Sequence, residues 1–254
     1  SVLADGRIVY SRWDYVDRSA AHFHGLWTSN PDGTNPIEIF GSYTQQINAC
    51  FQPRAVPGSR KIVFTAGAHH AAVGGSLVMI DPDRAALDPA TGETSLDAIE
   101  RVTPDVCFPE APGWPASYFH APWPLSEDWF LVGFSFDPLP GMGPGVKEDT
   151  ETGLYLLGRS GCLELLYRRP GISAMYPIPC APRPVPPVIA GSCDPAIPPG
   201  SLMRADDLMN LFFRRIDGTV RSGRIGGGGV LDPTLKRAID EAARRLADGE
   251  LVAF

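Results

Sequence analysis

Short apolar runs alternate with turn-forming residues over roughly the first three quarters of the chain. Runs that are rich in β-branched and aromatic residues, and that are bounded by Gly, Pro, Asp or Ser, are typical of β-strands. The pattern predicts strands over residues 8–10, 26–28, 61–65, 77–80, 129–132, 154–157 and 163–167. Because turn signals interrupt every run before a long helix could form, the pattern predicts an all-β fold.

The turns between these runs follow a repeated order. Pro31, Asp32 and Gly33 separate one pair of runs, and Pro57, Gly58 and Ser59 precede another. Proline presets φ, aspartate bonds its own backbone, and glycine accepts a positive φ, so both tripeptides suit tight turns. A strand–turn–strand unit that recurs every few tens of residues indicates stacked units, none of which buries its apolar face alone.

Two further segments complete this pattern. The run over residues 77–80 is continuously apolar, which is typical of a strand buried on both faces. Residues 154–157 and 163–167 flank the Gly/Ser-containing stretch 158–161, which predicts a hairpin.

The pattern changes after a proline-rich tract. Residues 177–187 alternate proline with other residues, which favours an extended polyproline II conformation and a domain exit. Farther on, residues 226–229 are four glycines, and Asp232 and Pro233 stand as N-cap and first residue of an amphipathic helix over about 232–248. We therefore expect a repeat domain over 1–190 and a Gly/Pro-linked tail with one helix over 191–254.

The composition agrees with short strands and argues against nucleic acid as a partner. The 254 residues include 26 prolines and 27 glycines, and 44% of the residues are hydrophobic, which is ordinary for a globular chain. A formal net charge of -7 argues against nucleic-acid binding, because phosphate contacts need clustered Lys and Arg. No apolar run is long enough to predict a membrane span.

The five cysteines do not form a cofactor motif. None of them lies in a C-x-x-C arrangement, which excludes a zinc knuckle and a covalent c-type haem site within the chain. Buried free thiols in strands are the favoured interpretation, and a disulfide among the last three remains the alternative for an exported protein. The cysteines are Cys50, Cys107, Cys162, Cys180 and Cys193.

Several strings resemble a known family of repeats. NPDGTNP at 30–36 and PGSRKIVFT at 57–65 resemble the TolB-type, WD40-like β-propeller repeat. VYSRWDYVDR at 9–18, FTAGAHH at 64–70 and PWPLSED at 122–128 resemble the middle (propeller) domain of bacterial hydrazine synthase alpha-subunit-like proteins. The resemblance covers roughly 5–190 and implies a partial or complete β-propeller of four-stranded blades.

The chain departs from that pattern in three ways. It holds about three to four repeat units, whereas closed propellers have about four to eight blades. It lacks the C-x-x-C-H haem signature, and residues 191–254 do not match the family. Since it also begins at Ser1 without a methionine, we expect an excerpt or processed form of a longer protein.

The histidines are the first candidate site. His69 and His70 follow a predicted strand and are flanked by small residues, so their rings are expected at the mouth of the repeat domain. Together with His22, His24 and His120 they could converge on a metal or a haem, because neutral imidazole is a common metal donor. The alternative is that they pack in loops and bond to the backbone.

A charged and aromatic segment is the second candidate. Arg12, Asp14, Tyr15, Asp17 and Arg18 could line a channel and face a polar ligand or a partner domain. The favoured alternative is a salt-bridge network between blades. A phenolate can serve as an axial haem ligand, so Tyr15 is a further candidate, but nothing in the sequence marks it above Tyr10 or Tyr43.

Carboxylates near tryptophans are candidates for a general acid–base pair. Of Asp105, Glu110, Glu127 and Asp128, the last two fall in the turn slot of the repeat, so a turn role is favoured for them. No nucleophile elbow, P-loop, dinucleotide fingerprint or zinc-protease motif is present. The sequence therefore assigns no catalytic residue, and activity of the chain on its own is not expected.

Together these observations predict a scaffold or binding module. We expect it to mediate domain or subunit assembly within a larger bacterial, hydrazine-synthase-alpha-like protein. It would hold no cofactor itself, would contact protein partners rather than nucleic acid, and would lie in the periplasm or elsewhere outside the cytoplasm. The alternative is a subunit of a haem-dependent redox enzyme whose haems lie outside this segment.

Overall fold

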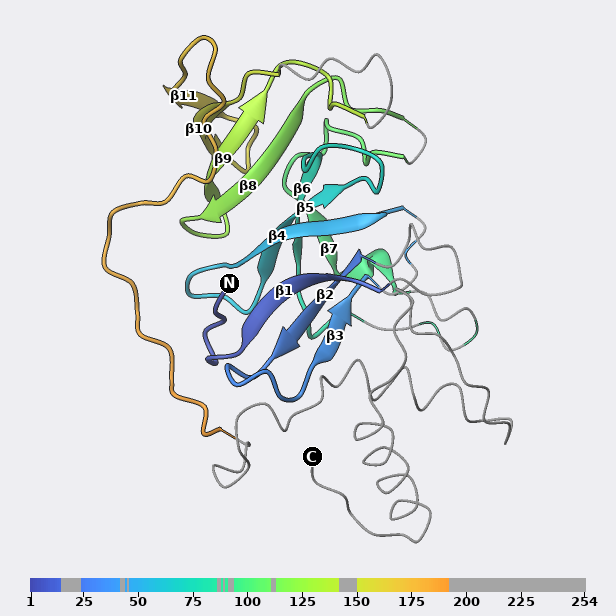
Figure 1. Ribbon diagram of the computed structural model, residues 1–254, viewed down its shortest axis with the longest axis vertical. Helices are drawn as coiled ribbons and strands as arrows, with labels where there is room; N and C mark the ends of the chain where they lie inside the picture. The colour runs from blue at the N-terminus through green and yellow to red at the C-terminus, as the bar shows by residue number, and fades with distance from the viewer. Residues whose placement is uncertain are drawn as a thin grey trace, which may run out of the picture. The chain divides into compact units, whose positions relative to one another are not determined.

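The described part of the chain is all-β (Figure 1). It forms strands β1 to β11 and one turn of 3₁₀ helix, and the hydrophobic pattern predicts seven of the eleven strands. The computed structural model describes residues 1–14, 24–41, 44, 46–85, 88, 90, 94–110, 113–141 and 150–191. No helix in these residues is long and apolar enough to cross a membrane.

The first three strands form an antiparallel group. Strand β1 (Ile8–Trp13) pairs with β2 (His24–Ser29), which also pairs with β3 (Ile37–Phe40). The predicted turn at Asp32 is confirmed, because its carboxylate accepts the backbone N–H of Thr34 at 3.0 Å and Gly33 has a φ of 84°.

A four-stranded antiparallel meander follows. It comprises β4 (Ala49–Ala55), β5 (Ile62–Gly67), β6 (Ser76–Ile80) and β7 (Ile99–Arg101), with the 3₁₀ turn η2 (Leu96–Ala98) before β7. A single parallel pairing, His24 with Ala49, joins this meander to β2 and makes a seven-stranded sheet.

A second four-stranded meander forms a separate sheet. Its order is β8 (Tyr118–Pro124), β9 (Trp129–Ser135), β10 (Gly153–Gly158) and β11 (Leu163–Tyr167). The hairpin between β10 and β11 is the one that the sequence predicts. The described residues contain no closed barrel, so the propeller remains a proposal.

The middle meander is buried on both faces. On one side, Ile62 and Phe64 of β5 and Val78 of β6 pack with Val9 and Leu26 of the first strands. On the other side, alternate residues of the same strands pack against β9 and β10; this cluster includes Val63, Leu77, Met79, Phe130, Val132, Phe134, Tyr155 and Leu157. The prediction that 77–80 is buried on both faces is confirmed, since every residue of β6 is buried.

Strands β4 and β8, which the hydrophobic pattern does not predict, each contain a β-bulge. In β4 the register shifts between Phe51 and Arg54, and in β8 it shifts between His120 and Trp123. A bulge adds one unpaired residue and accommodates a proline that could not donate to the ladder. Each bulge contains an X-Pro pair whose first residue has positive φ; these are Gln52 (φ 54°) with Pro53, and Ala121 (φ 48°) with Pro122.

The bulges bond to each other across the two sheets. The side-chain oxygen of Gln52 accepts the backbone N–H of Ala121 at 2.6 Å and the hydroxyl of Thr65 at 3.1 Å. Strands β4 and β8 therefore meet where each one departs from regular pairing.

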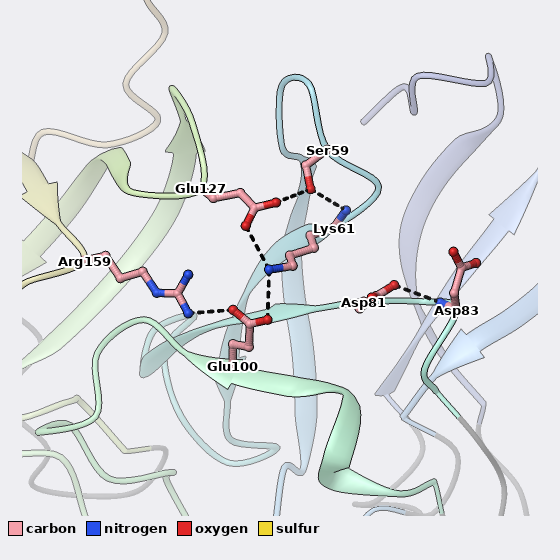
Figure 2. A network of polar contacts seen from close by, with 7 residues as sticks. All are labelled: Ser59, Lys61, Asp81, Asp83, Glu100, Glu127 and Arg159. Atoms are coloured by element: carbon pink, nitrogen blue, oxygen red, sulfur yellow. Dashed lines mark hydrogen bonds and ion pairs between the residues drawn. The ribbon is translucent and has the colours of Figure 1, made fainter.

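A polar network also links the two meanders (Figure 2). Lys61 binds Glu100 of β7 at 2.9 Å and Glu127 of the β8–β9 turn at 2.8 Å. Arg159 of the β10–β11 turn binds Glu100 at 2.6 Å, and Ser59 donates to Glu127 at 2.6 Å. The hydrogen bonds that Lys61 donates to Glu100 and then to Glu127 raise the pKa of Lys61, so the ammonium stays charged.

The chain after β11 runs without regular structure through the proline tract. Ala174 bonds Thr152 through both its N–H and its carbonyl, and Arg183 reaches the ring of Trp123. A Cβ placed on Gly6 would lie 2.5 Å from the carbonyl oxygen of Pro187, so the tract returns close to the first residues. The tract forms no strand or helix, and the N–H of Ala181 bonds the carbonyl oxygen of Pro179 at 3.0 Å.

The chain divides into two compact units after Ser192. The expected helix over 232–248, the glycines at 226–229 and Cys193 lie outside the described residues. The four described cysteines are free thiols. Only Cys50 among them is buried in a strand; Cys107 is intermediate, and Cys162 and Cys180 are exposed, so burial in strands is wrong as a general prediction for the cysteines.

Candidate functional site

Three rings from three segments form a compact cluster. Trp13 and His24 face each other across the β1–β2 ladder, and their rings stack with centroids 4.9 Å apart and planes 12° apart. His69, just after β5, stands edge-on to both rings at 5.0 and 4.9 Å. Nε2 of His24 lies 2.7 Å from Nδ1 of His69, so one imidazole donates to the other.

The strands explain why these rings meet. The single parallel pairing of β2 with β4 brings His24 to the start of β4, whose antiparallel partner β5 ends just before His69. The ring of Phe51 in β4 lies edge-on to His24 at 5.8 Å. Residues far apart in sequence therefore converge at one end of the seven-stranded sheet.

Glu110 organises the loop that carries the histidines. Its carboxylate accepts the backbone N–H of His69 at 2.8 Å, the backbone N–H of His70 at 3.1 Å and the side-chain amide of Asn48 at 2.8 Å. The ring nitrogen Nδ1 of His70 lies 2.8 Å from the same carboxylate. Burial acts to raise the pKa of Glu110, but these hydrogen bonds outweigh it and hold the pKa below its usual value.

His24 is neutral at physiological pH. Burial and then the proximity of His69 lower the pKa of His24 to about 4, although Glu110 acts in the opposite direction. A neutral imidazole carries one donor and one acceptor, which is what the hydrogen bond to His69 requires.

The His24–His69 geometry is that of a hydrogen bond. Two imidazole nitrogens bound tetrahedrally to one zinc would be roughly 3.3 Å apart, given Zn–N distances of about 2.0–2.1 Å. The observed 2.7 Å is shorter. Among the described residues no group of three or more His, Cys, Asp or Glu is arranged to hold a metal ion.

Aromatic and imidazole side chains in and next to the cluster are partly exposed to solvent. Trp13 is 46% exposed, and the side chain of His70 is 65% exposed. Flat aromatic and imidazole rings present stacking faces together with hydrogen-bonding edges, which suits a planar polar ligand or a partner side chain.

The other predicted site residues lie in different places. Arg12 binds Asp14 at 2.7 Å and stacks on Trp27 of β2 at 4.3 Å. His120 is buried in β8 and contacts none of the other described histidines; its two ring nitrogens have no hydrogen-bond partner among the described residues. Tyr15, Asp17, Arg18 and His22 lie outside the described residues.

The candidate carboxylates lie in different places. Glu127 and Asp128 lie in the β8–β9 turn, which confirms the turn interpretation, and Glu127 serves the network of Figure 2. Glu110, by contrast, belongs to the histidine cluster. Its role could not be inferred from sequence because it acts on residues that lie 40 positions or more away.

Comparison with known proteins finds a distant structural similarity. No protein-family model and no curated protein matches the chain. Among solved structures, the hydrazine synthase of Kuenenia stuttgartiensis is similar over 65% of this chain, with 21% sequence identity and a TM-score of 0.43. This chain spans 19% of the length of that one.

Proposed function

We propose that this chain is a propeller-type binding module that holds together domains or subunits of a larger protein. In this proposal the three strand groups are successive blades. Their first strands, β1, β4 and β8, would be the inner strands, and β4 contacts both of the others. The motif resemblance to hydrazine synthase alpha-subunit-like proteins supports the same role for the parent protein.

The main support for this proposal is that the edge strand β11 exposes apolar side chains. Leu165, Leu166 and Tyr167 are 54%, 53% and 49% exposed, so neighbouring residues that point to opposite faces are both open. β11 pairs only with β10 among the described strands. An unpaired edge lined by apolar side chains is a template for another strand, and it favours association with a protein partner.

A site-specific photocrosslinker tests this role. Benzoylphenylalanine at Leu166, in the full-length protein produced in its source cells, should crosslink to defined peptides of another domain or subunit. The control position is Val73, which is 41% exposed in the loop between β5 and β6. If position 166 gives no more crosslinks than position 73, β11 is not an assembly surface and the proposal fails.

The resemblance also brings a redox alternative, in which the parent protein carries haem outside this segment and lies outside the cytoplasm. The histidine cluster favours a ligand on this module, with His69 and His70 as its contacts. Absorption near the Soret band in the purified parent protein, but not in residues 1–191 expressed alone, would support a haem-bearing assembly around the module. Absorption in the isolated segment would instead place haem on it.

A further inference from the structure

Two arginines share one tryptophan ring at the contact between β4 and β8. The guanidinium carbon of Arg54 lies 4.4 Å from the ring centroid of Trp123, and that of Arg183 lies 5.2 Å from the same centroid. Arg54 comes from the bulge of β4, Trp123 from the bulge of β8, and Arg183 from the proline tract.

The shared bulge explains the placement of the first pair. Arg54 and Trp123 each follow the proline of an X-Pro bulge, so they hold equivalent positions in adjacent meanders. The bond from Ala121 to Gln52 fixes the two bulges against each other. The stack is therefore built by the inner strands, and the tract adds Arg183.

The positive charge at this point is not balanced. Neither arginine forms an ion pair or hydrogen bond with a carboxylate anywhere in the described ranges. Burial and then the nearby charge of Arg183 lower the pKa of Arg54, while Tyr176 acts to raise it. Two like charges held near each other, one of them half-buried, repel, and an anion bound by both would relieve that repulsion.

A neutral donor lies beside the arginines. The hydroxyl oxygen of Tyr176 accepts the amide N–H of Gln52 at 3.2 Å, so its own O–H remains available to donate. Tyr176 interacts electrostatically with Arg54, which places the phenol near the guanidinium. Planar guanidinium groups bind carboxylate and phosphate oxygens through paired N–H donors.

We propose that Arg54, Arg183 and Tyr176, arranged around Trp123, bind an oxyanion of the phosphate or carboxylate class. Both guanidinium groups lie against the ring of Trp123, and the arginines supply charge and paired donors. The site is independent of the assembly role proposed for β11, because it uses different strands and a different chemistry.

The test is an NMR titration of the Trp123 indole N–H, assigned with Trp123→Phe. Inorganic phosphate and glutarate are added separately at pH 7 and constant ionic strength. We expect a saturable shift with at least one anion, and the tighter of the two identifies the ligand class. Arg54→Gln and Arg183→Gln should each weaken binding about tenfold or more, because each removes charge-assisted hydrogen bonds.

Arg60→Gln is the matched control. It removes the same charge from a side chain that is 81% exposed and pairs with Asp83 elsewhere on the surface. The proposal is overturned if neither anion gives saturation, or if the Arg60 variant weakens binding as much as the other two. Should Arg54→Gln fail to fold, Arg183→Gln decides, since Arg183 lies in the exposed tract outside the sheets.

Discussion

His120 occupies an unusual position for a histidine. It is 1% exposed, and its ring lies so close to Gly133 of β9 that a Cβ on that glycine would be 2.2 Å from the ring carbon Cε1. His120 and Gly133 are direct cross-strand partners. The glycine is therefore required by the close approach of the ring rather than by its backbone angles.

Gly133→Ala should lower the free energy of unfolding by about 1–3 kcal/mol, because the added methyl group overpacks the His120 ring. Urea unfolding measures the loss. Gly141→Ala is the control, since its Cβ would meet nothing closer than 3.5 Å and should cost less than about 0.5 kcal/mol. In a His120→Ala background the additional cost of Gly133→Ala should be smaller; an undiminished cost there would show that the ring is not the obstacle.

The half-buried His24 and the buried His120 also predict a pH dependence of stability. Burial is the main cause that lowers the pKa of His24 and of His120 to about 4 in the folded chain, against an ordinary value of 6.5. Between these values the unfolded chain binds more protons than the folded chain, so stability falls as the pH drops from about 6.5 toward 4. Urea midpoints measured across this range report the effect.

His120→Leu, which removes one of the two titrations, should flatten the decline. Phe134→Leu is the comparison, because it changes a buried side chain of β9 without removing a titratable group, so its profile should keep the slope of the parent chain. A His120→Leu profile as steep as that of the parent would show that His120 does not contribute.

At the scale of elements, the two meanders contact each other through two sets of polar interactions. One set is the pair of bulges with Gln52, and the other is the network of Lys61, Glu100, Glu127 and Arg159. Lys61 bridges two carboxylates from different meanders, and its side chain is only 20% exposed. The network is thus less screened by solvent than an ordinary surface pair.

Lys61→Met, which keeps the apolar stem but removes the charge, should lower the free energy of unfolding by about 0.5–1 kcal/mol. Part of this loss should disappear at high salt, because salt screens the attraction in the parent chain. Arg60→Met, at the neighbouring exposed position, should have a smaller effect. Equal losses in the two variants at low salt would contradict a special role for Lys61.

The same elements show how much of the strand structure the sequence predicts. Runs such as 61–65 and 129–132 are confirmed as parts of β5 and β9, because their β-branched and aromatic residues fit a packed sheet. Strands β4 and β8 were not predicted, since Pro53, Pro122 and Pro124 argue against a strand. The repeated X-Pro pair, Gln-Pro at 52–53 and Ala-Pro at 121–122, is the signal that could have identified both.

At the scale of the whole described unit, burial is greatest in the middle. All residues of β5 and β6 are buried, whereas four of the five residues of β11 are exposed. Because opening β5 or β6 disrupts apolar clusters on two sides, their amides should exchange with solvent only through global unfolding. Hydrogen–deuterium exchange with mass spectrometry should give the slowest rates there and faster rates in β11.

Strand β9 serves as the internal comparison in that experiment. It lies in the centre of the second meander and has one face in a core cluster, so its rate should fall between those of β6 and β11. Exchange in β6 as fast as in β11 would mean that the two clusters do not act as one cooperative core.

The sequence by itself determined the all-β class, the turn at Asp32, the hairpin of β10 and β11 and the two-sided burial of β6. These features depend on local turn chemistry and on the order of apolar residues, which act over a few neighbouring positions. Only the tertiary structure decided that Glu110 holds the histidine loop, that His24 bonds His69, and that two arginines meet on Trp123. These contacts join residues distant in sequence, and they exist because single strand pairings and matched bulges bring separate meanders together.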